Sequence, residues 1–392
     1  MNHPEQPLSV GDRPWAVQAA TAFPGSVLLV KLGPLGEVVH TLPAAQAIRE
    51  AFPDARIGWV VEQSSASLVR SQPWVDETIE WDRRHWGGLG KLIRRLRTGN
   101  WDAAVDFQGL LVSSLIAWFS GAPRRVGFIP SLEAGHWFYN ERLPLESLEI
   151  HAVERHLALA AKLVGAAPAA PIDRPYLLRL PPTRDLHART NFPMHPSADD
   201  LAAVEAWGQS RRFNPGREQL VILNPHGSLS ANRWPVNHYV RLVQRLLERP
   251  QVRVALSGGV RARETCDDIA APFGDAVWRA DGRFSPLGMA ALFSQASAVV
   301  AGDTGPLHLA AAVGAPVVAL FGASSALRTG PYAANAIVLE AELACSPCGA
   351  KACPLKYDPP LCMQQIQVDR VLAAVLSRLA QARPAQPLRK SA

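Results

Sequence analysis

The chain has 392 residues, of which 48% are hydrophobic and 19% charged, so it is not a disordered polypeptide and has room for two large domains. The formal net charge is +6, and the surplus falls in the second half: residues 1–180 hold 18 basic and 18 acidic side chains, whereas residues 181–392 hold 22 and 16. A surplus of this size does not indicate a nucleic-acid partner, but it suits a small anionic ligand bound by the second half.

The first 25 residues are expected to form a loose leader. They carry no secretory signal, because the first apolar run follows charged residues and several prolines. No run of about 18 apolar residues occurs in the sequence, so no membrane-spanning helix is predicted. We therefore expect a cytoplasmic protein.

Short apolar runs that are typical of buried strands alternate with stretches of helical periodicity along the rest of the chain. The predicted strands lie at 27–32, 57–61, 103–107, 220–223, 252–256, 298–301 and 317–321. Strands that alternate with helices form parallel sheets covered on both faces. The pattern predicts an α/β protein with two Rossmann-like, doubly wound domains that face a central cleft.

A stretch rich in proline and polar residues, 181–197, separates the two predicted domains. We expect an N-terminal domain over 26–180 and a C-terminal domain over 198–365. A helix at 199–208 would open the C-terminal domain, and residues 366–392 would form a closing amphipathic helix and a tail.

The turn after the first predicted strand carries a candidate catalytic group. Gly33 and Gly36 allow the backbone to approach a ligand closely. Glu37 would begin the following helix, where the helix dipole favours the ionised carboxylate that a general base requires. Pro43 is expected to kink or restart that helix. The position also suits an acidic residue that only complements a helix N-terminus, and spacing alone does not choose between these roles.

A strongly basic stretch follows in the first half. It holds six basic side chains and no acidic one, namely Arg83, Arg84, Lys91, Arg94, Arg95 and Arg97. Its periodicity predicts a helix with the leucines inward and the arginines outward. Such a face is either solvated or binds carboxylates and phosphates, as found in an anionic acceptor or on a membrane surface.

A second glycine-containing turn, at residues 301–312, has the features of a phosphate site. Thr304 and Gly305 suit the cap of a helix that begins at Pro306. The unpaired N–H groups and the dipole of a helix N-terminus favour a bound phosphate. His308, one turn into this helix, would donate a hydrogen bond to a phosphate oxygen, or it would have only a structural role.

Three common motifs are missing from the sequence. It contains neither a G-x-x-x-x-G-K-[ST] segment nor a G-x-S-x-G segment, and no G-x-G-x-x-G follows the first strand. Their absence weighs against a P-loop NTPase, an α/β-hydrolase and an ordinary dinucleotide-dependent dehydrogenase.

Four cysteines lie close together near the end of the second domain. Cys345, Cys348, Cys353 and Cys362 have the spacing C-x2-C-x4-C-x8-C. Four thiolates in one loop can enclose a structural zinc ion. Reduced packing cysteines or a labile disulfide are the alternatives, and a disulfide framework is the less expected one in a reducing cytosol. Cys266 stands alone and is expected in the core.

Taken together, five segments resemble glycosyltransferase family 9, the bacterial heptosyltransferases of lipopolysaccharide core assembly. They are 31–43 (KLGPLGEVVHTLP), 106–110 (DFQGL), 224–227 (NPHG), 233–235 (RWP) and 303–310 (DTGPLHLA). They occur in the family's order, and the resemblance covers about residues 26–380. Segment 106–110, with 138–141 and 151–155, is most similar to the heptosyltransferase I branch.

The resemblance implies the GT-B fold and an inverting, metal-independent transfer that requires no cofactor. ADP-heptose would be the donor, held by the C-terminal domain. The acceptor would be an anionic glycolipid, the Kdo/inner core of lipid A, bound by the N-terminal domain. A cytoplasmic enzyme with such an acceptor is expected to make peripheral contact with the inner membrane.

Individual roles follow from the matching positions. Glu37 occupies the place of the family's catalytic carboxylate, which takes the proton of the acceptor hydroxyl. The expected donor-binding residues are Asp303, Thr304, Gly305, His308, Arg233, Asn224 and Glu264, the last as the acidic residue that binds the ribose. The expected acceptor-binding residues are Gly36, His40 and Gln108, with Arg83, Arg84, Arg94 and Arg95 of the basic stretch.

The sequence departs from the family pattern at three positions. The family usually has Asp in place of Glu37, and lysines in place of Val112 and Asn232. Arg233 remains available to meet phosphate groups. These departures leave two alternatives open, a family 9 transferase with another sugar or acceptor and a non-catalytic nucleotide-sugar-binding protein. A zinc-containing nucleic-acid module would leave both glycine-containing turns unexplained.

Overall fold

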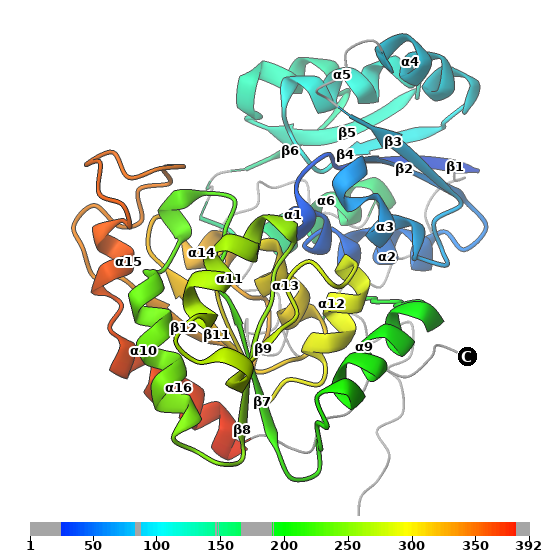
Figure 1. Cartoon of the computed structure of the whole chain (residues 1–392). Helices are drawn as coiled ribbons and strands as arrows, with labels where there is room; N and C mark the ends of the chain where they lie inside the picture. Colours follow the sequence, from blue (N-terminus) through cyan, green and yellow to red (C-terminus); the bar gives the residue numbers. More distant parts are fainter. Residues whose placement is uncertain are drawn as a thin grey trace, which may run out of the picture. The chain divides into compact units, whose positions relative to one another are not determined.

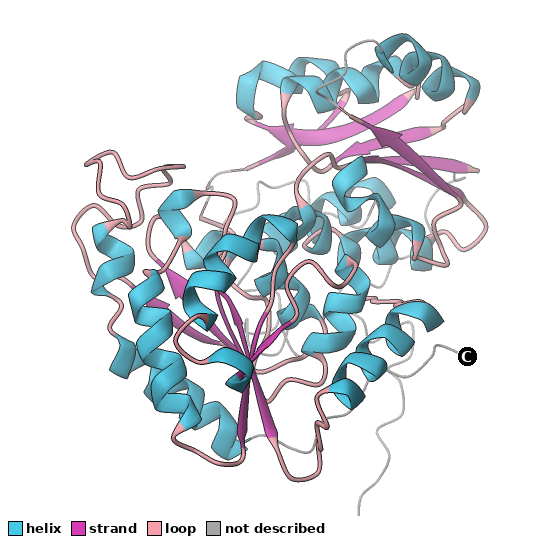
Figure 2. Ribbon diagram, in the orientation of Figure 1, coloured by secondary structure: helices cyan, strands magenta, loops and turns pink. Residues whose placement is uncertain are grey.

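The protein is described by a computed structural model that covers residues 25–82, 88–145, 147, 149–165, 190 and 192–381. The leader up to residue 24, Arg83, Arg84, nearly all of 181–191 and the tail from 382 lie outside the described residues. The chain divides into two compact units, Met1–Asn191 and Phe192–Ala392. In each unit, helices cover both faces of a sheet (Figure 2).

The sheet of the first unit has six parallel strands in the order β3-β2-β1-β4-β5-β6. The strands are β1 (Ser26–Val30), β2 (Arg56–Glu62), β3 (Glu77–Trp81), β4 (Ala103–Asp106), β5 (Arg124–Ile129) and β6 (Glu141–Pro144). The chain order reverses between the neighbours β1 and β4, where Val30 lies opposite Asp106. Doubly wound sheets bind ligands at the carboxyl ends of the strands beside such a reversal.

The helices of the first unit are α1 (Leu35–Val39), α2 (Leu42–Ala51), α3 (Ala66–Arg70), α4 (Leu89–Thr98), α5 (Leu111–Phe119) and α6 (Ala152–Val164), with the 3-10 turns η2 (Gln63–Ser65) and η4 (Leu132–Phe138). Helices α4 and α5 lie side by side on one face of the sheet, and α2 and α6 pack together on the other (Figure 1). Leu92, Leu96 and Ile116 fix α4 and α5 to the sheet, because they pack on Leu28 and Val30 of β1 in one buried cluster.

The second unit repeats this architecture with the strand order β12-β11-β10-β7-β8-β9, again all parallel. Its strands are β7 (Gln219–Asn224), β8 (Val252–Leu256), β9 (Val277–Arg279), β10 (Ala298–Gly302), β11 (Val317–Phe321) and β12 (Ile337–Glu340). Here the order reverses between β7 and β10, where Asn224 lies opposite Ala301.

Eight helices flank this second sheet within the described residues. They are α9 (Ala198–Ser210), α10 (Val236–Leu247), α11 (Arg263–Ala270), α12 (Pro286–Phe293), α13 (Gly305–Ala312), α14 (Ala326–Thr329), α15 (Leu361–Gln365) and α16 (Val368–Gln381), with the 3-10 turns η5 (Ser230–Asn232), η6 (Val260–Ala262) and η7 (Gly274–Ala276). Helices α10 and α16 cover one face, and α9, α12 and α13 cover the other (Figure 1). None of the helices in the described residues has both the length and the apolar character needed to cross a membrane.

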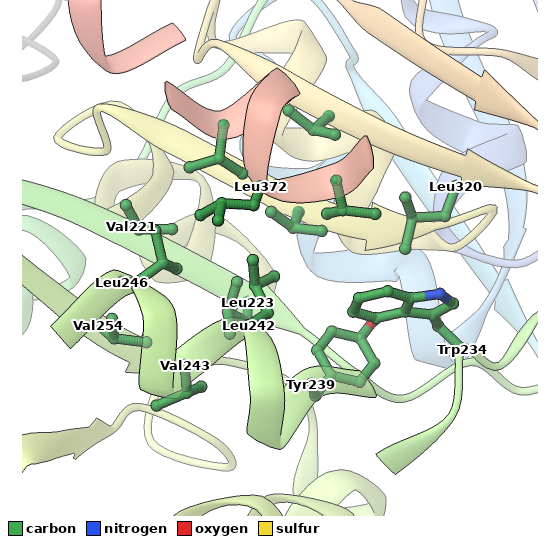
Figure 3. Close-up of a cluster of buried hydrophobic side chains, with 14 of the residues drawn as sticks. Val221, Leu223, Trp234, Tyr239, Leu242, Val243, Leu246, Val254, Leu320 and Leu372 are labelled. Carbon is green, nitrogen blue, oxygen red and sulfur yellow. The ribbon is translucent and has the colours of Figure 1, made fainter. Parts of the chain in front are cut away.

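The core of the second unit closes around α10 and α16. Leu242 and Leu246 of α10 and Leu372 of α16 pack against Leu223 and Leu320 of the sheet (Figure 3). The indole of Trp234 belongs to the same cluster, and its N–H donates to the carbonyl of Ile366 at 2.8 Å. This bond ties the segment before α10 to the segment before α16.

All seven predicted strands are present. The predicted connecting helix lies inside α9, and the predicted closing helix is α16, which begins at Val368 after the separate short helix α15. The α/β architecture with two parallel doubly wound sheets is therefore confirmed.

Candidate functional site

The first candidate site lies where β1 ends. Helix α1 begins at Leu35 and ends at Val39, and α2 begins at Leu42 with Pro43 in its first turn. Pro43 therefore restarts the helix, as predicted. Glu37 lies in the first turn of α1, beside the reversal between β1 and β4.

Glu37 is held by two side chains from the carboxyl ends of β1 and β4. The Lys31 ammonium lies 2.9 Å from Glu37 Oε2, and the Gln108 amide donates to the same oxygen at 3.0 Å. Lys31 also donates to the carbonyl of Phe107 at 3.3 Å. Only 6% of the Lys31 side chain is exposed, whereas Glu37 remains 43% exposed. Lys31 and Gln108 thus hold the Glu37 carboxylate in place, and solvent can still reach it.

These contacts keep Glu37 ionised. Burial alone would raise the pKa of Glu37, but the charge and hydrogen bond of Lys31, the hydrogen bond of Gln108 and the charge of Arg155 outweigh it. The pKa of Glu37 therefore lies below its usual value. The carboxylate is in the form that a general base requires.

Gly33 makes room for this arrangement. A Cβ atom at Gly33 would lie 2.7 Å from Cδ and 2.8 Å from Cβ of Glu37. The absence of a side chain at Gly33 thus serves the side chain of Glu37 itself, which folds back across the turn toward Lys31.

The turn after β4 is fixed by a buried carboxylate. Asp106 is fully buried and accepts hydrogen bonds from the Tyr139 hydroxyl at 2.6 Å, the Gln108 N–H at 2.8 Å and the Gly109 N–H at 3.2 Å. Burial raises the pKa of Asp106, and these hydrogen bonds oppose the rise. Gln108 also contacts Glu37. Asp106 and Tyr139 therefore position Gln108 beside the candidate base.

Replacing Tyr139 with Phe should show how much the hydrogen bond between Tyr139 and Asp106 contributes to the free energy of unfolding. The substitution leaves one buried oxygen of Asp106 without its donor, so the free energy of unfolding should fall by about 1–3 kcal/mol. Urea denaturation of the full chain measures the loss. Tyr357→Phe, at a half-exposed position, is the matched control and should change the value by less than about 0.5 kcal/mol. Equal values for the two variants would contradict the role of the Asp106–Tyr139 bond.

The other predicted acceptor-binding residues have different surroundings. Gly36 is buried, and His40 is buried with its ring edge-on to His151 at 5.2 Å. The His40 carbonyl accepts a hydrogen bond from Nδ1 of His156 at 3.1 Å. The structure thus places His40 within the packing behind α1, whereas Gln108 lies directly beside Glu37.

Arg94 and Arg95 are exposed on α4, as the periodicity predicts. Arg95 donates to Glu77 of β3 at 2.9 Å, so part of its charge is neutralised. Arg83 and Arg84 lie outside the described residues.

The second candidate site lies where β10 ends, beside the reversal between β7 and β10. Asp303 follows β10 directly, and its carboxylate lies 3.2 Å from Nε2 of His308 and accepts from the Thr329 hydroxyl at 3.2 Å. Burial would raise the pKa of Asp303, but the interactions with His308, Ser324 and Thr329 hold it below its usual value. Asp303 thereby ties the turn to α13 and α14.

The loop after β7 packs against this turn. The Asn232 amide donates to the carbonyl of Asp303 at 3.3 Å, and the Arg233 guanidinium donates to the carbonyl of Gly227 at 2.8 Å. A Cβ at Gly227 would lie 3.2 Å from Cγ2 of Thr304. The structure therefore brings together Asn224, Arg233, Asp303, Thr304, Gly305 and His308, the predicted donor-binding residues of these two segments.

Buried polar atoms at this edge point to a ligand. Oδ1 of Asn224, Nδ1 of His226 and Oγ1 of Thr304 are buried and have no hydrogen-bond partner among the described residues. Native proteins rarely leave such atoms unpaired, and three of them at the ends of neighbouring segments could serve a polar ligand or water. Glu264, in the first turn of α11, is exposed.

The predicted zinc site is not supported. The described residues contain no group of three or more His, Cys, Asp or Glu side chains that could hold a metal ion. Cys345 and Cys348 are exposed. Cys362, in the first turn of α15, is buried against Gly322. Burial, together with the neighbouring thiols, raises the pKa of Cys362. All five cysteines are free, and Cys266 is buried as predicted.

The sequence analysis assigned no role to Lys31, Asp106, Tyr139 or Thr329. A signal existed for Lys31 and Asp106, because each is a charged residue at the end of a run of buried apolar residues and needs a partner there. Tyr139 and Thr329 come from distant segments, and only the fold brings them to these carboxylates.

Comparisons with known proteins show which family this chain resembles. The sequence model of glycosyltransferase family 9 (heptosyltransferase) matches residues 89–357. Lipopolysaccharide heptosyltransferase 1 of Pseudomonas aeruginosa is 30% identical over a 373-residue alignment that covers 88% of this chain and 95% of the relative.

Two solved structures have the same fold. A family 9 glycosyl transferase from Veillonella parvula is 20% identical with a TM-score of 0.77, over 93% of this chain and 100% of that chain. E. coli heptosyltransferase WaaC with ADP-2-deoxy-2-fluoro heptose is 23% identical with a TM-score of 0.65, over 90% and 99%. These likenesses confirm the expected two-domain GT-B fold.

Proposed function

The chain belongs to glycosyltransferase family 9, and we propose that it transfers heptose from ADP-heptose to the Kdo/inner core of lipid A in lipopolysaccharide core biosynthesis. The observation that carries the proposal is the Glu37 carboxylate, accessible and held ionised by Lys31 and Gln108 at the carboxyl edge of β1. A non-catalytic sugar-binding protein would have no need of a buried lysine that keeps an accessible carboxylate charged.

Glu37 acts as the general base in this proposal. Its carboxylate takes the proton from an acceptor hydroxyl, whose oxygen attacks the anomeric carbon of the donor as the bond to the pyrophosphate breaks. ADP leaves with the electron pair of that bond. A single displacement of this kind inverts the configuration at the anomeric carbon. The added methylene of Glu37, relative to the usual Asp, is accommodated because the side chain folds across Gly33 toward Lys31.

The leaving pyrophosphate is bound at the carboxyl edges of β7 and β10. The N-terminus of α13 and the Thr304 hydroxyl donate to phosphate oxygens, and Arg233 supplies positive charge. His308 stands beside Asp303 in the same turn and stabilises the charge that develops on the leaving group. Asn224 and Glu264 bind polar groups of the nucleoside, Glu264 at the ribose.

The acceptor is bound by the first unit. Gln108 stands beside Glu37 and orients the acceptor hydroxyl. The arginines of the basic stretch, Arg94 and Arg95 on α4 with Arg83 and Arg84 outside the described residues, meet carboxylate and phosphate groups of the inner core. They offer a partial replacement for the two lysines that the family usually has at the positions of Val112 and Asn232.

A panel of donors and acceptors tests the proposal. The full chain is incubated with ADP-heptose, UDP-sugars or GDP-sugars and with acceptors with or without Kdo, in buffer with and without EDTA. We expect release of ADP only with ADP-heptose and a Kdo-containing acceptor, at the same rate in EDTA. Preference for another donor or acceptor would assign the chain to a different family 9 reaction. Tight ADP binding without transfer to any acceptor would favour a binding protein.

Lys31→Met should change the pH dependence of transfer. Lys31 holds the pKa of Glu37 below its usual value, so removal of its charge should raise that pKa and move the acid limb of the kcat profile to higher pH. The loss of rate should therefore be largest at low pH. Lys351→Met, at an exposed position of the second unit, is the control and should leave the profile unchanged. If the acid limb of Lys31→Met does not shift, Lys31 does not lower the pKa of Glu37.

A further inference from the structure

Large apolar side chains are exposed along α5 and η4 in the first unit. Trp118 is 44% exposed, Leu111 is 38% exposed and Trp137 is 71% exposed. Leu111 and Trp118 are seven residues apart on α5, which places them on one side of the helix. Such residues are not expected to cluster on a surface that faces only water.

Aromatic packing holds these side chains in place. The ring of Trp118 lies edge-on to Phe119 at 4.9 Å and to Phe138 at 6.1 Å. The turn η4 lies directly against α5, because a Cβ at Gly135 would be 2.8 Å from Oγ of Ser114. Trp118 therefore packs against η4, the turn that carries Trp137.

Positive charge borders the aromatic residues. Arg94 and Arg97 are exposed on α4, which lies beside α5 and contains no acidic residue (Figure 1). Arg97 reaches the end of α5, since its Cδ would be 3.7 Å from a Cβ at Gly121. On the far side, the Arg142 guanidinium lies 5.9 Å from the centre of the Trp137 ring. Within the described residues, neither Arg94 nor Arg97 forms an ion pair with an acidic side chain.

We propose that the face formed by Leu111, Trp118, Trp137, Arg94 and Arg97, here the α4–α5 face, docks on the surface of an anionic lipid bilayer. Tryptophan prefers the boundary between headgroups and acyl chains, where its ring is in an apolar layer and its N–H remains wet. Arginines beside it are attracted by anionic headgroups. The surface therefore matches both layers of a membrane interface.

A second copy of the chain fits this face less well. In a symmetric dimer the same basic surface would be part of the interface in both copies, and α4 has no acidic side chain to pair with its arginines. Like charges that meet across an interface are unfavourable. The bilayer proposal goes beyond the transfer reaction, and a glycolipid acceptor would give the docking a purpose.

Co-sedimentation with vesicles tests the proposal without donor or acceptor, so its outcome is independent of the transfer reaction. The full chain is mixed with vesicles of phosphatidylcholine alone or with added phosphatidylglycerol. We expect binding to the anionic vesicles, weakened by salt, and at least tenfold weaker binding to the neutral ones. Equal partition into both would overturn the proposal.

Two variants locate the surface. Trp118→Ser/Trp137→Ser and Arg94→Glu/Arg97→Glu should each weaken binding to anionic vesicles at least tenfold. Trp137→Ser alone, at the more exposed ring, should weaken it measurably and carries little risk to folding.

Matched controls lie in the second unit. Leu355→Ser, 61% exposed, and Arg217→Glu, also exposed, should bind vesicles as the unaltered chain does. If the controls and the α4–α5 variants bind equally, the proposal is wrong. If the chain fails to bind vesicles and instead self-associates in a way that Trp118→Ser/Trp137→Ser abolishes, the face is an interface between copies.

Discussion

Replacing Glu37 with Gln is expected to lower kcat for heptose transfer by about 10²–10⁴-fold. The amide keeps the size of the side chain and still offers an oxygen to Lys31 and Gln108, but it has no basic oxygen for the acceptor proton. Because Glu37 lies in the first unit and the proposed donor residues lie in the second, the KM for ADP-heptose should change little. Steady-state ADP release at saturating acceptor measures both constants.

Glu50→Gln is the matched control for this variant. Glu50 is exposed on α2, in the same unit. The kcat of Glu50→Gln should equal that of the unaltered chain. A thermal unfolding curve for each variant shows whether a loss of rate reflects loss of fold. Undiminished kcat in Glu37→Gln would remove Glu37 as the base and leave its contacts with Lys31 as structure alone.

The second large effect is expected at the donor site. In Asp303→Asn, the Kd for ADP should rise by about 10–100-fold, which corresponds to about 1–3 kcal/mol. The carboxylate accepts at one oxygen from Thr329 and lies with the other beside His308, whereas an amide has only one accepting oxygen. The loss should loosen the turn before α13, whose N–H groups and Thr304 hydroxyl bind the pyrophosphate in the proposed mechanism. Isothermal titration calorimetry with ADP measures it directly.

Asp275→Asn, an exposed carboxylate in η7 of the same unit, controls for the change in net charge. Its affinity for ADP should equal that of the unaltered chain. If Asp303→Asn also binds ADP with unchanged affinity, the turn after β10 is not the pyrophosphate site, and the unpaired atoms of Asn224 and Thr304 need another explanation.

Most central strands were predictable because they are buried on both faces, whereas β5, which lies between β4 and β6 and is only partly buried, was not predicted. In β1, β10 and β11 every residue is buried, so the sequence shows an uninterrupted apolar run. Edge strands lack this pattern. β3 and β6 are partly exposed and begin with Glu77 and Glu141, which pair with arginines of neighbouring elements, and periodicity alone did not indicate them.

The candidate sites were predictable to the extent that they are local in sequence. Glu37 and the segment Asp303–His308 each belong to a single strand-to-helix turn, and the strand end and helix start that give them meaning are visible in the sequence. Tyr139 is 33 residues from Asp106, and no short-range pattern links them. The cysteine cluster shows the opposite failure, because a plausible ligand spacing did not produce, in the part of the chain that the structure describes, a group of side chains that could hold a metal ion.

Mass spectrometry of a Kdo-containing lipid A acceptor, after incubation with the full chain and ADP-heptose, tests the proposed transfer. Each acceptor molecule should gain the mass of one heptose with the unaltered chain. With Glu37→Gln at the same protein concentration, almost no acceptor should gain heptose over the same time. If the unaltered chain is folded and binds ADP but the mass of the acceptor does not change, the chain does not catalyse this transfer.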